Sequence, residues 1–231
     1  MLTIIVPVFN EESTIKEILV KILKLKIKKQ IIVVDDASHD GTINKIINLK
    51  KKHKNILLIK HKKNLGKGSA IKNAQKFVKG QITIIQDADL EYEPKDYIKL
   101  IQPIKQNKTL VVYGSRFLNK KFKQNKIFIS NFRVFANIVL TKISNIINNQ
   151  KLTDAHTCYK VFDSKLFKSI KLKEKRFGFC PEVTTKIANL NVDIIELPIW
   201  YNGRSHKDGK KISFLDGVRA LYCLIKYKFN Y

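Results

Sequence analysis

The feature that most constrains this chain is the alternation, over its first half, of short apolar runs with longer amphipathic segments. The apolar runs are rich in Ile and Val, and they occupy residues 2–8, 31–34, 56–59, 82–85 and 110–113. Strands that alternate with helices at this spacing form a mostly parallel sheet with helices on both faces. We therefore predict an α/β fold whose ligands bind beyond the carboxyl ends of the strands.

The second half of the chain is less regular and contains two apolar segments interrupted by basic residues. Residues 127–147 include Arg133, and residues 214–231 include Arg219 and two lysines. Helices of this kind can lie in the plane of a membrane surface, or they can pack against the sheet. No repeat and no Pro-, Gly- or Ser-rich linker divides the chain, so we expect a single domain over residues 1–231.

The net charge of +26 is the strongest signal in the composition. Such a charge attracts polyanions, which include nucleic acids, anionic lipids and phosphorylated ligands, although a genome biased toward Lys codons gives the same composition. Cys158, Cys180 and Cys223 are far apart, and we expect them to be free thiols. We identify no spanning helix and no signal peptide, and therefore expect a cytoplasmic protein.

Acidic and amide side chains follow the first two apolar runs. Pro7, Asn10 and Glu11 stand where a dinucleotide-binding fold needs a glycine-rich turn, so this turn suits a base or ribose better than a pyrophosphate. Asp35 and Asp36 follow the second run, and adjacent carboxylates repel each other unless they engage hydrogen-bond donors. One of them can accept from a base or ribose while the other holds the loop. Each motif alone also fits an ordinary helix start.

A short glycine motif precedes the helix expected after the third run. Gly66 and Gly68 flank Lys67, and in such a loop backbone amides can approach an anion. The motif is too short for a Walker loop. A plain turn remains the alternative.

Two carboxylates separated by one residue, Asp87 and Asp89, follow the fourth run. At the end of a buried strand this arrangement is costly without a cation. Hard oxygen ligands suit Mg²⁺ or Mn²⁺, and such a metal would bridge the phosphates of a diphosphate leaving group. A solvated acidic loop is the less favoured interpretation.

These strand-end motifs, PVFNEE, VVDDASHDGT, NLGKGSA, DADLEY and GSRF, resemble those of the family 2 glycosyltransferases. Within that family the chain most resembles the dolichol-phosphate mannosyltransferase group, over nearly its whole length. The resemblance implies a nucleotide-diphospho-sugar transferase (GT-A type) fold. It also implies inverting transfer of a hexose, with mannose favoured and glucose possible, from GDP-mannose or UDP-glucose to a polyprenyl phosphate.

The resemblance assigns residues 1–115 to nucleotide-sugar binding and residues 116–231 to acceptor binding. The residues that it assigns to the donor are Pro7, Asn10, Glu11, Asp36, Gly66, Lys67, Asp87 and Ala88. It assigns the metal to Asp87 and Asp89, with Glu91 as a third ligand at a position where many relatives carry Gln. Catalysis falls to Asp89, Arg116, Arg133 and Arg204.

The acceptor decides which catalytic groups are needed. A phosphate monoester has a second pKa near ~6 and is already nucleophilic at neutral pH, so it needs cations rather than a base. The candidates to bind it are Arg116, Arg133, Arg204 and Lys211. The alternative acceptor is a sugar hydroxyl in lipopolysaccharide or another surface glycan, and it would require a carboxylate base, for which Glu182 and Glu91 are the candidates.

Several points of the sequence limit these assignments. Residues 154–160 depart from the usual pattern of the group, which leaves the sugar open. We expect peripheral binding to the inner face of the plasma membrane, directly or through a membrane-protein partner. Nucleic acid is not expected as a partner, because the acids cluster at strand ends and no aromatic–basic RNA motif is present. A nucleotidyltransferase is disfavoured by the absence of its Gly-rich activation loop.

Overall fold

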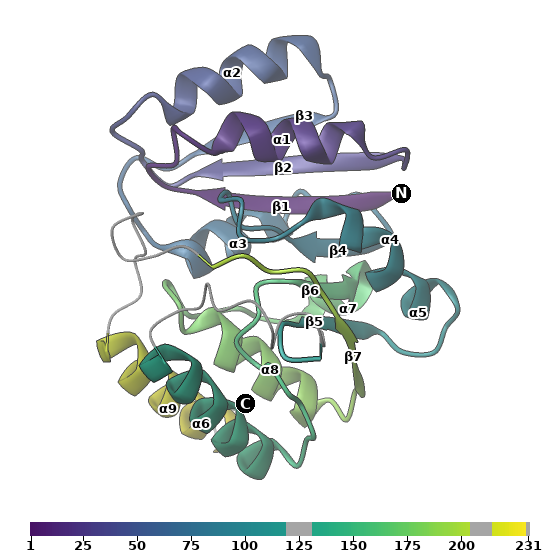
Figure 1. The fold of residues 1–231 in the computed structure, drawn as a ribbon, viewed down its shortest axis with the longest axis vertical. Coiled ribbons are helices and arrows are strands. Elements are labelled where there is room, and N and C mark those ends of the chain that lie inside the picture. The colour runs from purple at the N-terminus through teal and green to yellow at the C-terminus, as the bar shows by residue number, and fades with distance from the viewer. Residues whose placement is uncertain (119–130, 204–213, 230–231) are drawn as a thin grey trace.

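The computed structural model of the protein describes residues 1–118, 131–203 and 214–229 (Figure 1). In this part of the chain one seven-stranded sheet has the order β3-β2-β1-β4-β6-β5-β7. Its strands are β1 (Leu2–Val8), β2 (Lys29–Asp35), β3 (Ile56–Lys60), β4 (Ile82–Ile85), β5 (Val111–Ser115), β6 (Lys160–Asp163) and β7 (Ile194–Pro198). The predicted α/β fold with a mostly parallel sheet and helices on both faces is confirmed.

One strand departs from the parallel arrangement. Strand β6 is inserted between β4 and β5 and runs antiparallel to both, with Val161 opposite Ile84 on one side and Val112 on the other. Strand β7 then pairs parallel with β5 at the edge. Both strands lie in the half where the sequence shows no regular alternation, and neither was predicted.

The helices of the first half follow the predicted order. They are α1 (Ile15–Lys24), α2 (Thr42–Lys52), α3 (Lys67–Gln75), α4 (Tyr97–Leu100) and α5 (Gln102–Lys105), with a 3₁₀ turn η1 (Pro94–Asp96) ahead of α4. Pro94 begins η1, as suits a residue favoured in the first turn of a helix. The helical segment breaks between α4 and α5, because the ring of Pro103 cannot continue a helix and lacks an N–H group.

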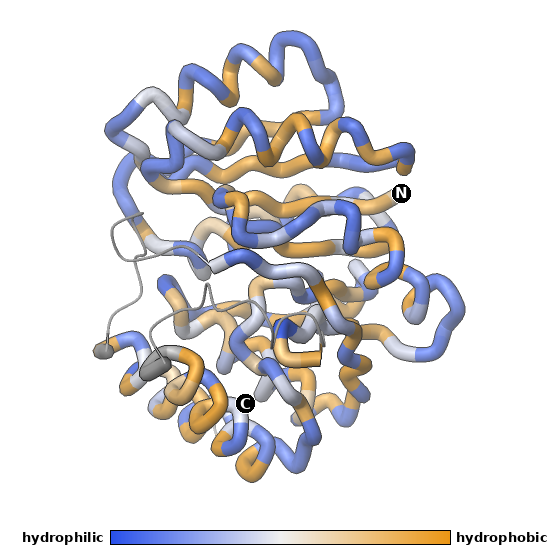
Figure 2. The backbone as a smooth tube through the Cα atoms, viewed as in Figure 1, coloured by the Kyte–Doolittle hydropathy of each residue, from blue (hydrophilic) through white to orange (hydrophobic). Residues whose placement is uncertain are grey.

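The second half contributes α6 (Asn131–Asn148), α7 (Ser164–Ser169), α8 (Phe179–Asn189) and α9 (Phe214–Phe229). Helices α6, α8 and α9 pack against one another as a group below the sheet in Figure 1. The two apolar segments of the sequence thus form α6 and α9, along which hydrophobic and hydrophilic residues alternate in Figure 2. None of the helices in the described residues combines the length and hydropathy needed to cross a bilayer.

Strand register brings the predicted motifs to one edge of the sheet. Val8 at the end of β1 is paired with Asp35 at the end of β2, so the loops after both strands lie side by side. The pairing of β1 with β4 ends at Ile5 opposite Ile85. Pro7 therefore lies beyond the part of β1 that pairs with β4. A residue without an N–H group is tolerated there, because no hydrogen bond to β4 is lost.

Candidate functional site

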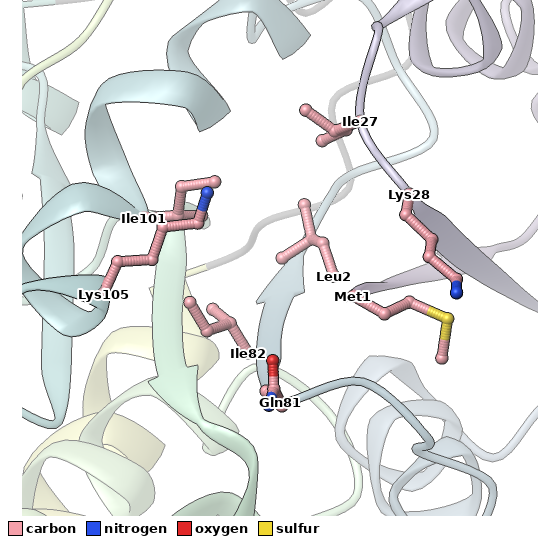
Figure 3. A pocket seen from close by; sticks show the side chains of 8 residues that line it. All are labelled: Met1, Leu2, Ile27, Lys28, Gln81, Ile82, Ile101 and Lys105. Atoms are coloured by element: carbon pink, nitrogen blue, oxygen red, sulfur yellow. The ribbon is translucent and has the colours of Figure 1, made fainter.

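A cavity of about 260 Å³ lies at the amino ends of β1 and β4 (Figure 3). Its lining includes Met1, Leu2, Ile82, Ile101 and Lys105, and no carboxylate is among its lining side chains. This edge of the sheet is opposite to the one that carries the acidic motifs. The cavity is therefore not the site that the sequence predicts.

The loops after β1 and β2 are joined by reciprocal hydrogen bonds. The amide of Asn10 donates to Ser38 Oγ at 3.0 Å, and the amide of His39 donates back to Asn10 Oδ1 at 2.9 Å. Glu11 is buried, and its amide donates to Thr42 Oγ1 at 2.9 Å. Asn10 has a φ of 49°, a left-handed conformation that Asn tolerates better than most residues. The predicted donor residues of β1 are thus held in place by the loop that follows β2.

Asp35 and Asp36, at the carboxyl end of β2, have different hydrogen-bond partners. Both oxygens of Asp36 are bonded within the protein: Oδ1 accepts from the amide of Leu65 at 2.8 Å and lies 2.6 Å from His61 Nδ1, and Oδ2 accepts from the amide of Gly66 at 2.7 Å. Asp35 is also buried, but its Oδ1 has no hydrogen-bond partner in the described part of the chain. Asp36, the predicted nucleoside ligand, is therefore the carboxylate that holds the loop, and Asp35 is the one with an unused oxygen.

The two glycines at the start of α3, Gly66 and Gly68, contact another part of the chain rather than forming the anion site that was predicted. The amide of Gly68 donates to the carbonyl of Arg176 at 3.2 Å, and the amide of Gly66 is already bonded to Asp36. A Cβ atom on Gly66 would lie 2.5 Å from the carbonyl oxygen of Lys175, and one on Gly68 would overlap that of Glu174. These positions require glycine because residues 174–176 pack directly against them. The amides of both glycines are therefore occupied by protein oxygens.

Lys67 and Asp87 form an ion pair at the centre of this edge. Lys67 Nζ lies 2.5 Å from Asp87 Oδ1 and 3.5 Å from the buried sulfur of Cys158. Burial lowers the pKa of the Lys67 ammonium, but the Asp87 carboxylate outweighs that effect, so the pKa stands well above its ordinary value. Two predicted donor residues from different loops are thereby brought into contact.

The three predicted metal ligands do not converge as one set. Asp89 Oδ1 accepts the amide of Glu91 at 3.1 Å, and Glu91 Oε2 accepts the hydroxyl of Tyr201 at 2.8 Å. Within the described residues no group of three or more carboxylate, His or Cys side chains has an arrangement that holds a metal ion. Two carboxylates supplemented by substrate phosphates and water are nevertheless a usual donor set for a hard divalent ion. Asp87 and Asp89 fit that set, whereas the Glu91 carboxylate is bonded to Tyr201.

Arg116 is held by a buried bidentate ion pair. Its Nε and Nη2 donate to Asp154 Oδ2 and Oδ1 at 2.7 and 2.8 Å, and its guanidinium lies 5.1 Å from the centre of the Tyr201 ring. Burial raises the pKa of the Asp154 carboxyl, but Arg116 outweighs it and holds that pKa below its ordinary value. Arg116 Nη1 has no hydrogen-bond partner in the described residues. Arg204 and Lys211 lie outside the described residues, as does the side chain of Arg133 in the first turn of α6.

Residues 153–159, which include Asp154, form a compact turn ahead of β6. This turn lies at the edge of the sheet that carries the acidic motifs. Lys160 is fully buried beneath the turn, where its ammonium donates to the carbonyls of Ala155 and Thr157 at 2.8 and 2.9 Å and lies 3.9 Å from the centre of the Tyr113 ring. Sequence reasoning noted this stretch only as a departure from a pattern. A lysine within a short apolar run was the signal that could have indicated a buried cation.

The family of the chain follows from its sequence as a whole. The sequence profile of glycosyl transferase family 2 matches residues 3–171. The chain belongs to this family. It is therefore a glycosyltransferase, and the predicted enzyme class is confirmed.

Curated relatives of this glycosyltransferase act on dolichyl phosphate according to their names. The dolichyl-phosphate β-glucosyltransferase ALG5A of Trichomonas vaginalis is 28% identical over 97% of this chain and 72% of its own. The UDP-N-acetylglucosamine–dolichyl-phosphate N-acetylglucosaminyltransferase of Methanococcus voltae is 28% identical over 99% of this chain and 96% of its own. The dolichol-phosphate mannosyltransferase of Pyrococcus furiosus is 25% identical over 98% of this chain and 64% of its own.

A solved structure shares the fold. Glucosyl-3-phosphoglycerate synthase from Mycobacterium tuberculosis, in complex with Mn²⁺, uridine diphosphate and phosphoglyceric acid, superposes with a TM-score of 0.71. It is 15% identical and covers 99% of this chain and 78% of that one. The predicted GT-A type fold is thereby confirmed.

Two further carboxylates of this glycosyltransferase are bonded inside the second half. Glu182 is fully buried, with Oε1 accepting from Lys186 Nζ and the Lys173 amide at 2.6 Å each, and Oε2 accepting from the Glu174 amide at 2.8 Å. Glu174 in turn binds α9, accepting hydrogen bonds from Arg219 at 2.8 Å and from Tyr227 at 2.7 Å. Arg219 thus anchors α9 to the segment beside Gly66 and Gly68.

Proposed function

We propose that the protein transfers a hexose, with inversion, from a nucleotide diphosphate sugar to a polyprenyl phosphate at the cytoplasmic face of the membrane. The observation that carries this choice of acceptor is the burial of Glu182, whose two oxygens accept three hydrogen bonds within the protein. A hydroxyl acceptor needs an accessible carboxylate base, for which Glu182 was one of the two candidates. The other candidate, Glu91, is buried and bonded to Tyr201. A phosphate acceptor needs no base, because its own oxygen is the nucleophile.

Transfer to a phosphate is then a single displacement at the anomeric carbon. A phosphate oxygen of the acceptor forms the new C–O bond as the bond to the nucleoside diphosphate breaks, and the bonding electron pair leaves with the diphosphate. Arg116, fixed by Asp154 with its Nη1 unused, binds the acceptor phosphate together with Arg133, Arg204 and Lys211. Charge-assisted, bidentate-capable groups are suited to that task.

The donor lies over the carboxyl ends of β1, β2 and β4. In this proposal the nucleoside is held by Pro7, Asn10, Glu11 and Ala88 together with Asp35, whose Oδ1 is unused, while Asp36 holds the loop beneath it. Asp87 and Asp89 would hold Mg²⁺ or Mn²⁺, which supplies positive charge to the departing diphosphate. The mycobacterial structure named above contains Mn²⁺ with uridine diphosphate, which supports a divalent ion. Asp89 is the carboxylate that we assign to catalysis.

The outer surface of α6 and α9 supports peripheral membrane binding. Exposed apolar side chains recur along both helices, with exposed fractions of 64% at Phe135, 81% at Ile146, 74% at Leu215 and 56% at Ile225. Basic residues flank them, and Lys and Arg near anionic lipid contribute about 1 kcal/mol each. We propose that this surface binds the inner face of the plasma membrane, where a polyprenyl acceptor would be found.

We favour mannose from GDP-mannose, with glucose from UDP-glucose as the alternative. The names of the relatives cover glucose, N-acetylglucosamine and mannose, so they do not choose among these donors.

The test is label transfer from a panel of nucleotide sugars. Purified protein is incubated with a polyprenyl phosphate, Mn²⁺ or Mg²⁺, and labelled GDP-mannose, UDP-glucose or UDP-N-acetylglucosamine, beside an Asp89→Asn variant of the same volume. We expect metal-dependent transfer of label to the lipid phase, and a loss of at least 100-fold in Asp89→Asn. Donor binding without lipid labelling, combined with transfer to a glycan hydroxyl, would overturn the acceptor assignment. Failure to bind any nucleotide sugar would overturn the whole proposal.

A further inference from the structure

The turn formed by residues 153–159 contacts both the residue proposed for the acceptor phosphate and the residues proposed for the donor diphosphate. At its start Asp154 binds Arg116, the residue proposed for the acceptor phosphate. Near its end the sulfur of Cys158 lies 3.5 Å from Lys67 Nζ, which is paired with Asp87 at the proposed diphosphate site. In a displacement reaction the transferred sugar lies between the nucleophile and the leaving group. The middle of this turn, which is His156, therefore runs alongside the position of the sugar.

Most polar side chains of the turn already have partners. Thr153 Oγ1 is bonded to Ser115 and Glu196, and both oxygens of Asp154 are bonded to Arg116. His156 Nε2, in contrast, is buried and has no hydrogen-bond partner among the described residues. Buried polar atoms are almost always paired, so an unpaired one beside a ligand site indicates a partner that the ligand supplies. His156 as a whole is partly exposed, so rotation of its ring can bring Nε2 to the ligand.

The chemistry of this imidazole matches a hydroxyl group. Burial, reinforced by the nearby Lys160 ammonium, lowers the pKa of His156 to about 4. The ring is therefore neutral at pH 7 and offers one donor and one acceptor nitrogen. A sugar hydroxyl also donates and accepts, whereas a phosphate dianion only accepts.

We propose that His156 is a specificity-determining residue that hydrogen-bonds a hydroxyl of the transferred hexose. This inference rests on the proposed function, because it needs a sugar between Arg116 and the Lys67–Asp87 pair. It assigns a role to the stretch where the sequence departs from the usual pattern of its group. Thr157 Oγ1, in the next residue of the turn, is also buried and unpaired in the described residues.

Calorimetric titration of the full chain separates the sugar from the nucleotide. The ligands are UDP, UDP-glucose and its C4 epimer UDP-galactose, with GDP, GDP-mannose and its C2 epimer GDP-glucose as the second series. The variants are His156→Ala and His156→Gln, and the matched control is His53→Ala at the carboxyl end of α2. For His156→Ala we expect an unchanged Kd for the nucleoside diphosphate and an approximately tenfold weaker Kd for the preferred nucleotide sugar.

The kinetic counterpart is the preference between epimers. We expect the ratio of their kcat/KM values to move toward one in His156→Ala, to be partly restored in His156→Gln, and to stay unchanged in His53→Ala. Equal weakening of nucleoside diphosphate and nucleotide sugar would overturn the inference. So would an unchanged epimer ratio with a raised KM for polyprenyl phosphate. If His156→Ala fails to fold, His156→Gln is compared with wild type, and a smaller shift of the ratio toward one is expected. A wild-type protein that binds no nucleotide at all would instead reject the proposed function.

Discussion

At the carboxyl end of β2 Asp36 is held by backbone amides, whereas at the carboxyl end of β5 Arg116 is held by a buried carboxylate. The amides that bind Asp36 come from Leu65 and Gly66 in the loop after the next strand. Asp154, which binds Arg116, lies beyond α6. The first half of the site is thus positioned largely by loop backbone, and the second half by side chains that are far apart in the sequence.

This difference determines how each half responds to substitution. Replacing Asp36 removes the hydrogen bonds from two backbone amides and the contact with His61, but it leaves no arginine without a counter-charge. A buried ion pair is different, because removing one partner leaves an uncompensated charge in the interior. The second half should therefore be the more sensitive of the two.

The largest effect is expected from the buried ion pair. We expect Asp154→Ala to lower the free energy of unfolding by about 3–5 kcal/mol, because it leaves the Arg116 guanidinium buried without a counter-charge. We expect Asp36→Ala to cost about 1–3 kcal/mol. Urea unfolding followed by circular dichroism gives both values. The double variant Asp154→Leu with Arg116→Met should recover most of the loss. Equal costs for the two single variants would remove the contrast between the halves.

Next in size is the packing of the two halves against each other at Gly68. An added methyl group there would overlap the carbonyl of Glu174, so we expect Gly68→Ala to destabilise the protein by about 1–3 kcal/mol. Gly217 in α9 is the matched control, since a Cβ there has no atom within 4 Å. We expect Gly217→Ala to stabilise the protein by about 0.5–1 kcal/mol through helix propensity. Thermal unfolding should show a lower Tm for Gly68→Ala and a higher Tm for Gly217→Ala. A change of Tm in the same direction for both variants would contradict the packing argument.

A smaller, pH-dependent effect is expected at Glu174, which ties α9 to the segment beside Gly68. Burial raises the pKa of this carboxyl, but hydrogen bonds from Arg219, Tyr227 and Lys226 outweigh it and lower the pKa to about 2. Because the folded pKa is below the unfolded one, the stabilisation is complete above about pH 5 and disappears as the pH falls toward 2.

The measurement is the unfolding free energy of Glu174→Gln and wild type between pH 2.5 and 7. Since the Arg219 side chain is 52% exposed, we expect a difference of only about 1 kcal/mol at pH 7. That difference should shrink as the pH is lowered. A difference that stays constant over this range would show that the charge of Glu174 does not contribute.

The smallest effect on stability is expected on the outer surface of α9. Leu215→Ser and Ile225→Ser should change the unfolding free energy by no more than about 0.5 kcal/mol, because both side chains are exposed. Both should reduce co-sedimentation with vesicles that contain anionic lipid. Phe77→Ser is the control, since Phe77 is exposed to a similar degree, 45%, after α3 in the other half. Unchanged vesicle binding in the α9 variants would contradict the proposed membrane surface.

Much of the first half could be predicted because its signals are local. The runs at β1 and β4 match the observed strands at both ends, and the acids that follow them lie where the strand-end rule places them. The division of roles between Asp35 and Asp36 could not be predicted, because both occupy the same kind of position in the sequence. It depends on which carboxylate the Leu65 and Gly66 amides reach in three dimensions.

By itself the sequence determined the α/β class, the positions of the first four strands along the chain and the edge that carries the acids, because hydrophobic periodicity and β-branched residues are patterns within a few residues. Only the tertiary structure decided the insertion of β6 between β4 and β5, the Arg116–Asp154 pair and the burial of Lys160. Strand β6 is four residues long and begins and ends with charged residues, so it has little pattern of its own. Its place is set by pairing with strands far away in the chain, and by a buried charge that is stable only once its partners have assembled.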